Sequence, residues 1–188
     1  PLSNVIWAVA GVAVSMILAF AMTMMTYSDE EPKEKTASKS AAASDGPRVV
    51  VSPFAGKVIP LSEVEDEVFA GGMMGQGLAV IPEDGKVYSP CDGTVSTVFP
   101  TGHAVGITAD NGAETLIHLG MDTVKLDGKG FTKKVKDKDR VKTGQLLIEF
   151  DLDLVKEAGY SVVSPVIVSN TDEFADVAPG ASGNVKPG

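Results

Sequence analysis

Residues 49 to 176 contain short apolar runs separated by glycine, proline, asparagine and aspartate, and this pattern restricts the fold more than any other feature. The runs are VVVSPF, GLAVI, KVYSP, GTVSTVF, HAVGITA, AETLIHLG, QLLIEFD and SVVSPVIVSN. Runs of this length bounded by turn-forming residues are typical of β-strands. The 20 glycines of the chain supply many tight turns. The pattern therefore predicts an all-β sandwich or barrel.

Two short helices are expected to interrupt the strands. The first begins at Ser62, whose Ser-x-x-Glu spacing to Glu65 fits a capping box, and ends at Gly71-Gly72. The second runs from about Leu152 to Ala158 and stops at Gly159.

The sequence also contains an internal repeat. Ser52-Pro-Phe-Ala-Gly56-Lys-Val58 recurs 37 residues later as Ser89-Pro-Cys-Asp-Gly93-Thr-Val95, and a third Ser-Pro follows at Ser164-Pro165. Two copies are too few for a solenoid. We expect two related β units that pack together over one shared core.

An uncharged apolar segment precedes the domain. Residues 5–27 read VIWAVAGVAVSMILAFAMTMMTY, and at about 1.5 Å per residue they span the roughly 30 Å hydrocarbon layer. We predict a transmembrane helix over residues 1–28, with a buried soluble helix as the alternative. Lysines and an arginine follow this segment, which places its C-terminal side in the cytoplasm. The chain begins at Pro1, and we expect it to be the end of a longer polypeptide.

Polar, low-complexity sequence flanks the predicted domain. Residues 29–48 predict a flexible linker, and residues 177–188 predict a disordered tail. The net charge of −9 argues against nucleic acid as a partner, because phosphate backbones need Lys and Arg stripes. The single cysteine, Cys91, excludes a disulfide framework or a cysteine-based metal site, and we expect it to be structural.

The chain has only two histidines, His103 and His118, and a hairpin signal lies between them at Asp110-Asn111-Gly112. With Asn111-Gly112 as a two-residue turn, His118 faces Val105 and His103 faces Gly120. Both imidazoles then project from the same face as diagonal neighbours, with Cβ atoms up to roughly 7–8 Å apart. The hypothesis depends on the register, because a slip of one residue moves side chains to the other face.

A neutral imidazole nitrogen can accept a phosphoryl group near neutral pH, while the second ring nitrogen carries a proton held by an acceptor. The stretch His118-Leu-Gly120 offers backbone carbonyls for that purpose. The second imidazole would donate hydrogen bonds to the phosphoryl oxygens. Two alternatives remain at this point: the histidines are ordinary surface residues, or they are two ligands of a zinc site.

Several segments resemble the IIA domain of the glucose-type sugar phosphotransferase family, which includes glucose, sucrose and beta-glucoside systems. They are Val64–Ala70, Ser89–Val95, Thr101–Ala104, Gly112–Val124, Ile148–Leu152 and Pro165–Asn170. The run Ile117-His-Leu-Gly-Met-Asp-Thr123 is highly specific. The resemblance runs from residue 53 to about residue 174, which is essentially the whole predicted domain, and implies an antiparallel β-sandwich-like fold with short helices.

The resemblance also implies the roles of individual residues. His118 would be phosphorylated on Nε2, His103 would support the phosphoryl group, and Thr101 would orient His103. Two acidic positions, Asp66 and Asp122, would face an arginine of the donor, the histidine-containing phosphocarrier protein. An apolar rim for partner docking would consist of Val68, Phe69, Met74, Phe99, Leu116 and Val124. Glu65, Glu67 and Thr115 depart from the family pattern without affecting the histidines.

A hydrophobic helix, a polar linker and a IIA domain together look like the C-terminal end of a fused permease. We therefore expect a phosphoryl carrier that passes phosphate from the phosphocarrier protein to a IIB cysteine on the same longer chain. It would need no cofactor beyond the covalent phosphohistidine, and it would sit on the cytoplasmic side of a bacterial inner membrane. A regulatory zinc ion shared by His103, His118 and a partner carboxylate is a further expectation from the resemblance.

Two other protein classes fit less well. A membrane-anchored zinc peptidase of the lysostaphin type needs more histidines and a His-x-His pair, which this chain lacks. A lipoyl or biotinyl carrier needs a hairpin lysine in Met-Lys-Met or Asp-Lys-Ala, and neither tripeptide occurs.

Overall fold

The computed structural model describes residues 48–178, 180 and 182–188. The predicted transmembrane helix over residues 1–28 lies outside this range, and so does all of the linker over residues 29–48 except its last residue. Among the described residues no helix is long and apolar enough to cross a bilayer.

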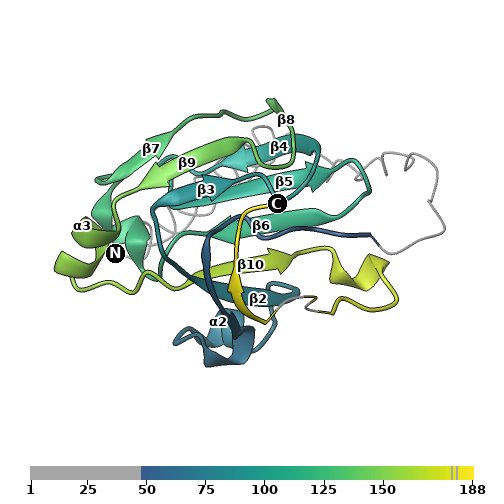
Figure 1. The fold of residues 1–188 in the computed structure, drawn as a ribbon, viewed down its shortest axis with the longest axis horizontal. Helices are drawn as coiled ribbons and strands as arrows, with labels where there is room; N and C mark the ends of the chain where they lie inside the picture. The colour runs from purple at the N-terminus through teal and green to yellow at the C-terminus, as the bar shows by residue number, and fades with distance from the viewer. Residues whose placement is uncertain (1–47, 179, 181) are drawn as a thin grey trace, which may run out of the picture. The chain divides into compact units, whose positions relative to one another are not determined.

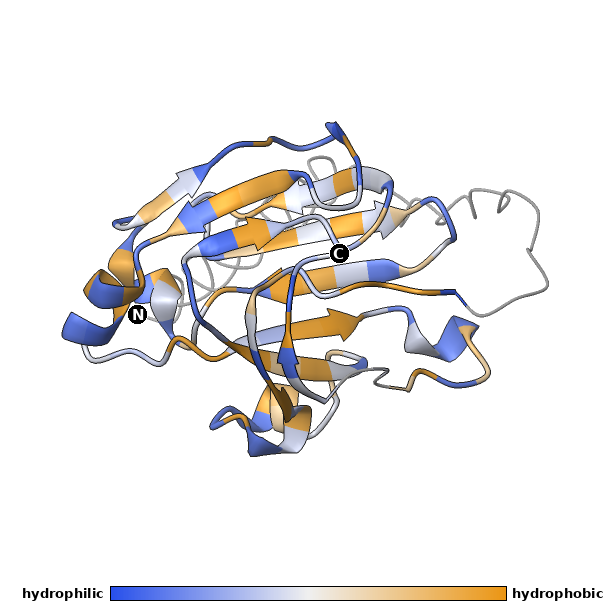
Figure 2. Ribbon diagram, viewed as in Figure 1, coloured by the Kyte–Doolittle hydropathy of each residue, from blue (hydrophilic) through white to orange (hydrophobic). Residues whose placement is uncertain are grey.

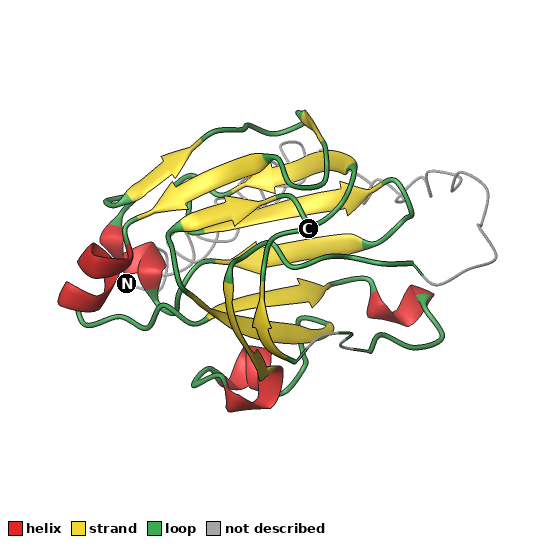
Figure 3. Cartoon of the chain, viewed as in Figure 1, coloured by secondary structure: helices red, strands yellow, loops and turns green. Residues whose placement is uncertain are grey.

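Within these ranges most of the regular secondary structure consists of short strands, joined by turns and loops (Figures 1 and 3). The strands are β1 Gly56–Pro60, β2 Gln76–Pro82, β3 Lys86–Tyr88, β4 Gly93–Val98, β5 Ala104–Ala109, β6 Glu114–His118, β7 Phe131–Lys133, β8 Arg140–Val141, β9 Leu146–Phe150, β10 Ser164–Val168 and β11 Gly183–Val185. The α-helices are α2 Glu67–Ala70 and α3 Leu152–Glu157, and the 3-10 helices are η1 Leu61–Glu63, η2 Thr123–Leu126 and η3 Thr171–Glu173. The prediction of an all-β fold with two short α-helices is confirmed.

Eight strands form one antiparallel sheet in the order β11-β1-β2-β10-β6-β5-β4-β8, and three form a second, β3-β9-β7. The two sheets share the main core, in which Val105 and Ile117 of the large sheet join Val87 and Ile148 of the small one. All four side chains are fully buried. Figure 2 shows that apolar colour concentrates on the strands and polar colour on the turns, as expected for alternating burial.

The large sheet has two equivalent halves when its strands are counted inward from each edge. β11 then corresponds to β8, β1 to β4, β2 to β5 and β10 to β6. The registers agree, because the pair Gly56–Pro82 between β1 and β2 corresponds to Gly93–Ala109 between β4 and β5. We call β1, β2, β10 and β11 the apolar half, and β4, β5, β6 and β8 the histidine half. The sheet therefore has approximate twofold symmetry about an axis between β10 and β6.

The repeat found in the sequence marks this symmetry. Its two copies lead into β1 and β4, and they exchange equivalent backbone hydrogen bonds. The Val51 N–H donates to the Pro90 carbonyl at 3.0 Å, and the Tyr88 N–H donates to the Pro53 carbonyl at 2.9 Å. The prediction that two related β units pack over one shared core is confirmed.

The prediction of a disordered tail over residues 177–188 is wrong for Gly183–Val185. This segment forms β11 and pairs with β1, with Gly56 opposite Val185. The equivalent pair in the histidine half is Gly93 opposite Val141. Without this segment the outer edge of β1 would have unpaired backbone groups. Backbone pairing does not depend on the apolar side chains from which strands are predicted in a sequence.

The predicted helix starting at Ser62 is also corrected. Residues Leu61–Glu63 form only the 3-10 helix η1, which has no side-chain cap. The α-helix begins after Asp66, whose carboxylate accepts hydrogen bonds from the Val68 and Phe69 N–H groups at 2.9 and 3.2 Å. An aspartate followed by free amides caps a helix as well as a Ser-x-x-Glu box does, so the local sequence offered two starts. The predicted ends at Gly71 and at Gly159 are confirmed.

Candidate functional site

The hairpin that joins the two histidine-bearing segments differs from the prediction by one residue. Ala104 lies opposite His118, where a two-residue turn at Asn111-Gly112 would place Val105. The Ala109 N–H donates to the Ala113 carbonyl at 2.8 Å, so the hairpin loop has three residues, 110 to 112. Gly112 has a positive φ of 90°, whereas Asn111 does not. The Asn111 side-chain carbonyl instead accepts a hydrogen bond from the Ala113 N–H at 3.1 Å. A two-residue type I′ turn needs positive φ at both positions, so the predicted register is wrong.

The two imidazoles nevertheless lie side by side, with ring centroids 5.2 Å apart and planes inclined by 74°. In the observed register a regular strand would direct His103 into the main core with Val105. His103 precedes β5, however, and follows Gly102, which has a φ of 74°. This left-handed bend releases His103 from strand alternation and lets its ring reach His118.

His118 ends β6 on the face opposite the main core. Ile117 belongs to the main core, whereas Leu116 packs against a second buried cluster that contains Phe69. The prediction that Leu116 and His118 share a face is therefore confirmed by the alternation along β6. The Phe69 ring lies 5.2 Å from the His118 ring, and the Phe99 ring lies 5.2 Å from the His103 ring. Each imidazole is thus walled on one side by an aromatic ring.

Each ring has a hydrogen-bond partner at Nδ1. The His118 Nδ1–H donates to the Gly120 carbonyl at 2.8 Å, which leaves Nε2 as the unprotonated nitrogen of a neutral ring. The Thr101 hydroxyl lies 2.5 Å from His103 Nδ1. A hydroxyl that donates to Nδ1 leaves the His103 Nε2–H as a donor. The site can therefore present one bare ring nitrogen beside one ring N–H.

Burial and charge set the protonation of the pair. Burial lowers the pKa of His103, and the neighbouring His118 lowers it further. Burial also lowers the pKa of His118, opposed by the Gly120 carbonyl and by the carboxylates of Asp66 and Asp122. Both pKa values therefore lie below the ordinary imidazole value of 6.5, and both rings are mainly neutral at neutral pH.

The two predicted acidic residues have structural contacts of their own. Asp66 caps α2, as described above. Asp122 adopts a left-handed φ of 60° and forms an ion pair with Lys125 at 2.9 Å. Because both carboxylates raise the pKa of His118 through space, they lie close enough to act on its charge.

The predicted rim residues divide into two groups. Val68, Met74, Phe99 and Val124 are exposed, with 36–50% of their surface accessible. Phe69 is buried against the His118 ring, and Leu116 is half-buried against the second cluster, so neither belongs to an exposed rim.

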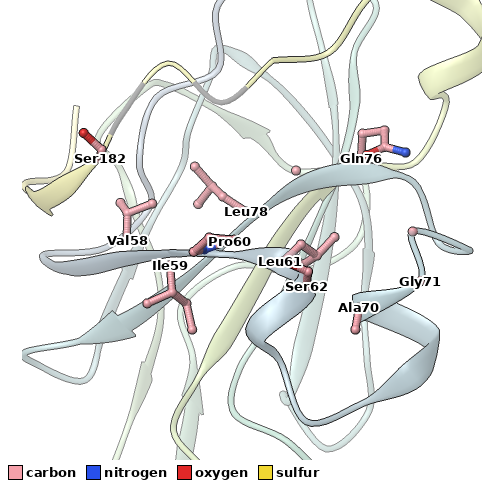
Figure 4. Close-up of a pocket in the computed structure, with 12 residues that line it drawn as sticks. Val58, Ile59, Pro60, Leu61, Ser62, Ala70, Gly71, Gln76, Leu78 and Ser182 are labelled. Atoms are coloured by element: carbon pink, nitrogen blue, oxygen red, sulfur yellow. The ribbon is translucent and has the colours of Figure 1, made fainter.

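Other reactive groups in the described residues lack this arrangement. Burial raises the pKa of the Cys91 thiol to about 11, which suits the predicted structural role. The described residues contain no group of three or more His, Cys, Asp or Glu side chains placed to hold a metal ion. A pocket of about 450 Å³ between η1, α2, β1 and β2 has no ionisable side chain in its lining (Figure 4).

Comparison with known proteins gives one consistent family. Residues 48–174 match the family model described as phosphoenolpyruvate-dependent sugar phosphotransferase system, EIIA 1. The chain is 44% identical over 183 residues to the PTS system beta-glucoside-specific EIIBCA component of Bacillus subtilis, covering 97% of this chain and 30% of that protein. It is 48% identical over 149 residues to the PTS system glucose-specific EIIA component of Oceanobacillus iheyensis, covering 79% of this chain and 82% of that protein.

A solved structure shows the same fold. Glucose permease IIA from Mycoplasma capricolum matches with a TM-score of 0.69 at 39% identity, covering 75% of this chain and 91% of that one. The chain spans only about 30% of the length of the beta-glucoside relatives from Bacillus subtilis and Dickeya chrysanthemi. In those relatives the matching region is one part of a longer EIIBCA component.

Proposed function

The chain belongs to the EIIA 1 family of the phosphoenolpyruvate-dependent sugar phosphotransferase system, and we propose that it carries a phosphoryl group on Nε2 of His118. EIIA components are phosphotransferases of this system. The observation that carries the proposal is the His118 Nδ1–H bond to the Gly120 carbonyl, 2.8 Å long, beside a second imidazole 5.2 Å away. This bond leaves Nε2 free for attack.

In the proposed reaction, Nε2 of His118 attacks the phosphorus of a phosphohistidine on the phosphocarrier protein. The Nε2–P bond forms while the donor's N–P bond breaks, and the donor imidazole leaves with the electron pair. Positive charge builds on the His118 ring, and the Gly120 carbonyl, Asp66 and Asp122 stabilise it. A IIB cysteine thiolate then attacks the phosphorus, which forms an S–P bond and returns neutral His118.

His103 and Thr101 complete the proposed site. When the Thr101 hydroxyl donates to Nδ1, the His103 Nε2–H points its proton outward and can bind a phosphoryl oxygen. The exposed side chains Val68, Met74, Phe99 and Val124 supply an apolar surface for brief docking, with Asp66 and Asp122 pairing with a donor arginine. A partner seated there would dry the site and strengthen its hydrogen bonds.

The surroundings of the domain belong to the same proposal. The fused EIIBCA relatives support a IIB partner on the same longer polypeptide, and residues 1–28 would hold the domain at the cytoplasmic face of a bacterial inner membrane. The linker over residues 29–48 would then raise the effective concentration of the carrier near IIB. The covalent intermediate needs no additional cofactor, and the two histidines could supply two ligands to a regulatory zinc ion completed by a partner carboxylate.

The test is phosphorylation by the phosphocarrier protein, its kinase and labelled phosphoenolpyruvate. Label should appear on the wild-type chain, survive alkali, and disappear in His118→Ala. A Cys91→Ala variant is the control for the other nucleophile and should label normally. Label that persists on His118→Ala would overturn the assignment.

A further inference from the structure

The backbone that holds His118 is itself held by two buried hydroxyl groups. The Thr123 hydroxyl donates to the Leu119 carbonyl at 2.6 Å, and the Gly120 N–H donates to the Ser164 hydroxyl at 3.1 Å. These two backbone groups belong to the same peptide unit, Leu119–Gly120. Thr123 and Ser164 are both fully buried, so water does not compete for either bond. One peptide plane is therefore fixed at both of its ends.

The next peptide unit, Gly120–Met121, carries the carbonyl that binds His118. Its N–H donates to the Ser161 carbonyl at 2.8 Å, opposite the side on which Gly120 O accepts the His118 Nδ1–H. Gly120 has a φ of 72°, and a Cβ there would lie 2.6 Å from Ser161 O and 2.7 Å from Thr123 Cγ2. Only glycine fits this turn, and the contacts around it allow one orientation of the Gly120 carbonyl.

The Ser164 hydroxyl also has a fixed orientation. It donates its one proton to the Val162 carbonyl at 2.9 Å, so a lone pair must face the Gly120 N–H. Ser164 therefore cannot turn to donate toward the loop. The hydroxyl links strand β10 to the end of β6 in a single arrangement.

We propose that Ser164 and Thr123 are positioning residues that select the tautomer of His118. By fixing the Leu119–Gly120 peptide they aim the Gly120 carbonyl at Nδ1, which keeps the proton there and leaves Nε2 bare for phosphoryl transfer. The part of this inference that concerns transfer rests on the proposed function, whereas the part that concerns the tautomer does not. Free imidazole populates both tautomers, so the backbone must supply the preference.

The chain offers a matched control in Thr115. Its side chain is also buried, and its hydroxyl donates to the Ile107 carbonyl at 3.2 Å. It lies on β6, three residues from His118, but makes no hydrogen bond to the Gly120 turn. Thr115→Val thus removes a buried hydroxyl bond of the same kind without touching the proposed clamp.

The experiment labels the histidine rings of the full chain with 15N and reads the tautomers by NMR. Because the chain has only two histidines, the ring signals can be assigned from a His103→Gln variant. In wild type, His118 should carry its proton on Nδ1. Ser164→Ala and Thr123→Val should each lower the ratio of the Nδ1–H to the Nε2–H form about tenfold, consistent with the loss of one buried hydrogen bond. Thr115→Val should leave the ratio within about twofold, and Ser164→Thr, which keeps a hydroxyl, should restore it.

The rate of phosphoryl acceptance from the phosphocarrier protein is measured on the same variants. It should fall in parallel with the tautomer ratio for Ser164→Ala and Thr123→Val and stay near wild type for Thr115→Val and Ser164→Thr. Unchanged tautomers in the first two variants, or an equal change in all variants, would overturn the clamp. A shifted tautomer in a chain that never labels on His118 would leave the clamp standing and overturn the proposed function instead.

Discussion

The two halves of the large sheet share a backbone but differ in chemistry. By the symmetry, His118 at the end of β6 corresponds to Ile167 of β10, and His103 before β5 corresponds to Gln76 at the start of β2. Ile167 is 1% exposed and belongs to the second buried cluster, beneath η1 and α2. The comparison shows that the fold supplies the same frame twice, and that the two equivalent positions carry imidazoles in one copy and Ile167 and Gln76 in the other.

The bends next to these positions are also equivalent. Gly102 and Gly75 both have positive φ, and each donates its N–H to the carbonyl three residues before it, Phe99 and Gly72 respectively. Where the histidine half has Phe99 and Thr101, the apolar half therefore has Gly72 and Met74. The bend belongs to the scaffold, whereas the aromatic wall and the hydroxyl partner of His103 are particular to one half.

The largest expected effect on phosphoryl acceptance comes from replacing His118 by isoleucine, the residue at the equivalent position of the apolar half. His118→Ile should abolish phosphoryl acceptance, with a loss of at least about 1,000-fold, because no bare nitrogen remains. Labelling with phosphoenolpyruvate, the kinase and the phosphocarrier protein measures it, and urea denaturation should show a fold at least as stable as wild type. Residual labelling within tenfold of wild type would mean that His118 is not the phosphorylated residue that distinguishes the histidine half.

The reciprocal change tests the apolar half. Ile167→Ala should lower the free energy of unfolding by about 2–5 kcal/mol, because it leaves a cavity beneath α2. Acceptance by the remaining folded protein should stay close to wild type. Urea denaturation at neutral pH gives the stability, with exposed Ile81→Ala in the same half as the control; equal losses in both variants would contradict the assigned burial.

A smaller effect is expected at the second imidazole. His103→Gln introduces the residue that the apolar half has at the equivalent position, Gln76. The variant should still accept a phosphoryl group on His118. Onward transfer to IIB should slow by about 10- to 100-fold, because the ring N–H that Thr101 orients for the phosphoryl oxygens is replaced by a flexible amide that Thr101 does not orient. Rapid-quench measurement of the two half-reactions separates these steps. If loading slows as much as onward transfer, His103 acts on the nucleophile rather than on the phosphoryl group.

The pH dependence should distinguish the halves as well. Because the folded pKa values of both histidines lie below 6.5, the unfolded chain takes up protons first as pH falls. Their contribution to stability is complete above about pH 6.5 and is lost as pH drops toward the folded values. Acceptance by the folded protein falls only near the lower end of that range, where pH passes through the folded pKa of His118. Unfolding free energies between pH 8 and 5 measure it, and a His103→Gln, His118→Ile double variant should lose this component. A double variant with the wild-type profile would assign the dependence to other groups.

The smallest effect is expected at the edge of the apolar half. Deleting residues 183–188 removes β11 and should lower the melting temperature by only a few degrees, since three short backbone pairs are lost. Replacing Val141 of β8 by proline should cost more, because Val141 is 1% exposed and part of the main core. Calorimetry compares the two; a larger loss from the tail deletion would reverse this ranking of the edges.

Much of this architecture could be read from the sequence. Short apolar runs between turn residues predicted an all-β domain, and the Ser-Pro repeat indicated two related units. Because the sequence has only two histidines, His103 and His118 were the candidates for the site. The family resemblance of the segments around those histidines is confirmed. These properties are local, because side-chain polarity and turn preference depend on residue type over short stretches of sequence.

Tertiary structure decided the rest. The hairpin register shifted by one residue because Asn111 caps its own loop, and the histidines still met because Gly102 bends the chain before β5. Strand β11 and the hydroxyl groups of Thr123 and Ser164 depend on partners far along the chain or on backbone groups. Pairing between distant segments rests on backbone hydrogen bonds that every residue can offer, so only the folded chain determines which of them form.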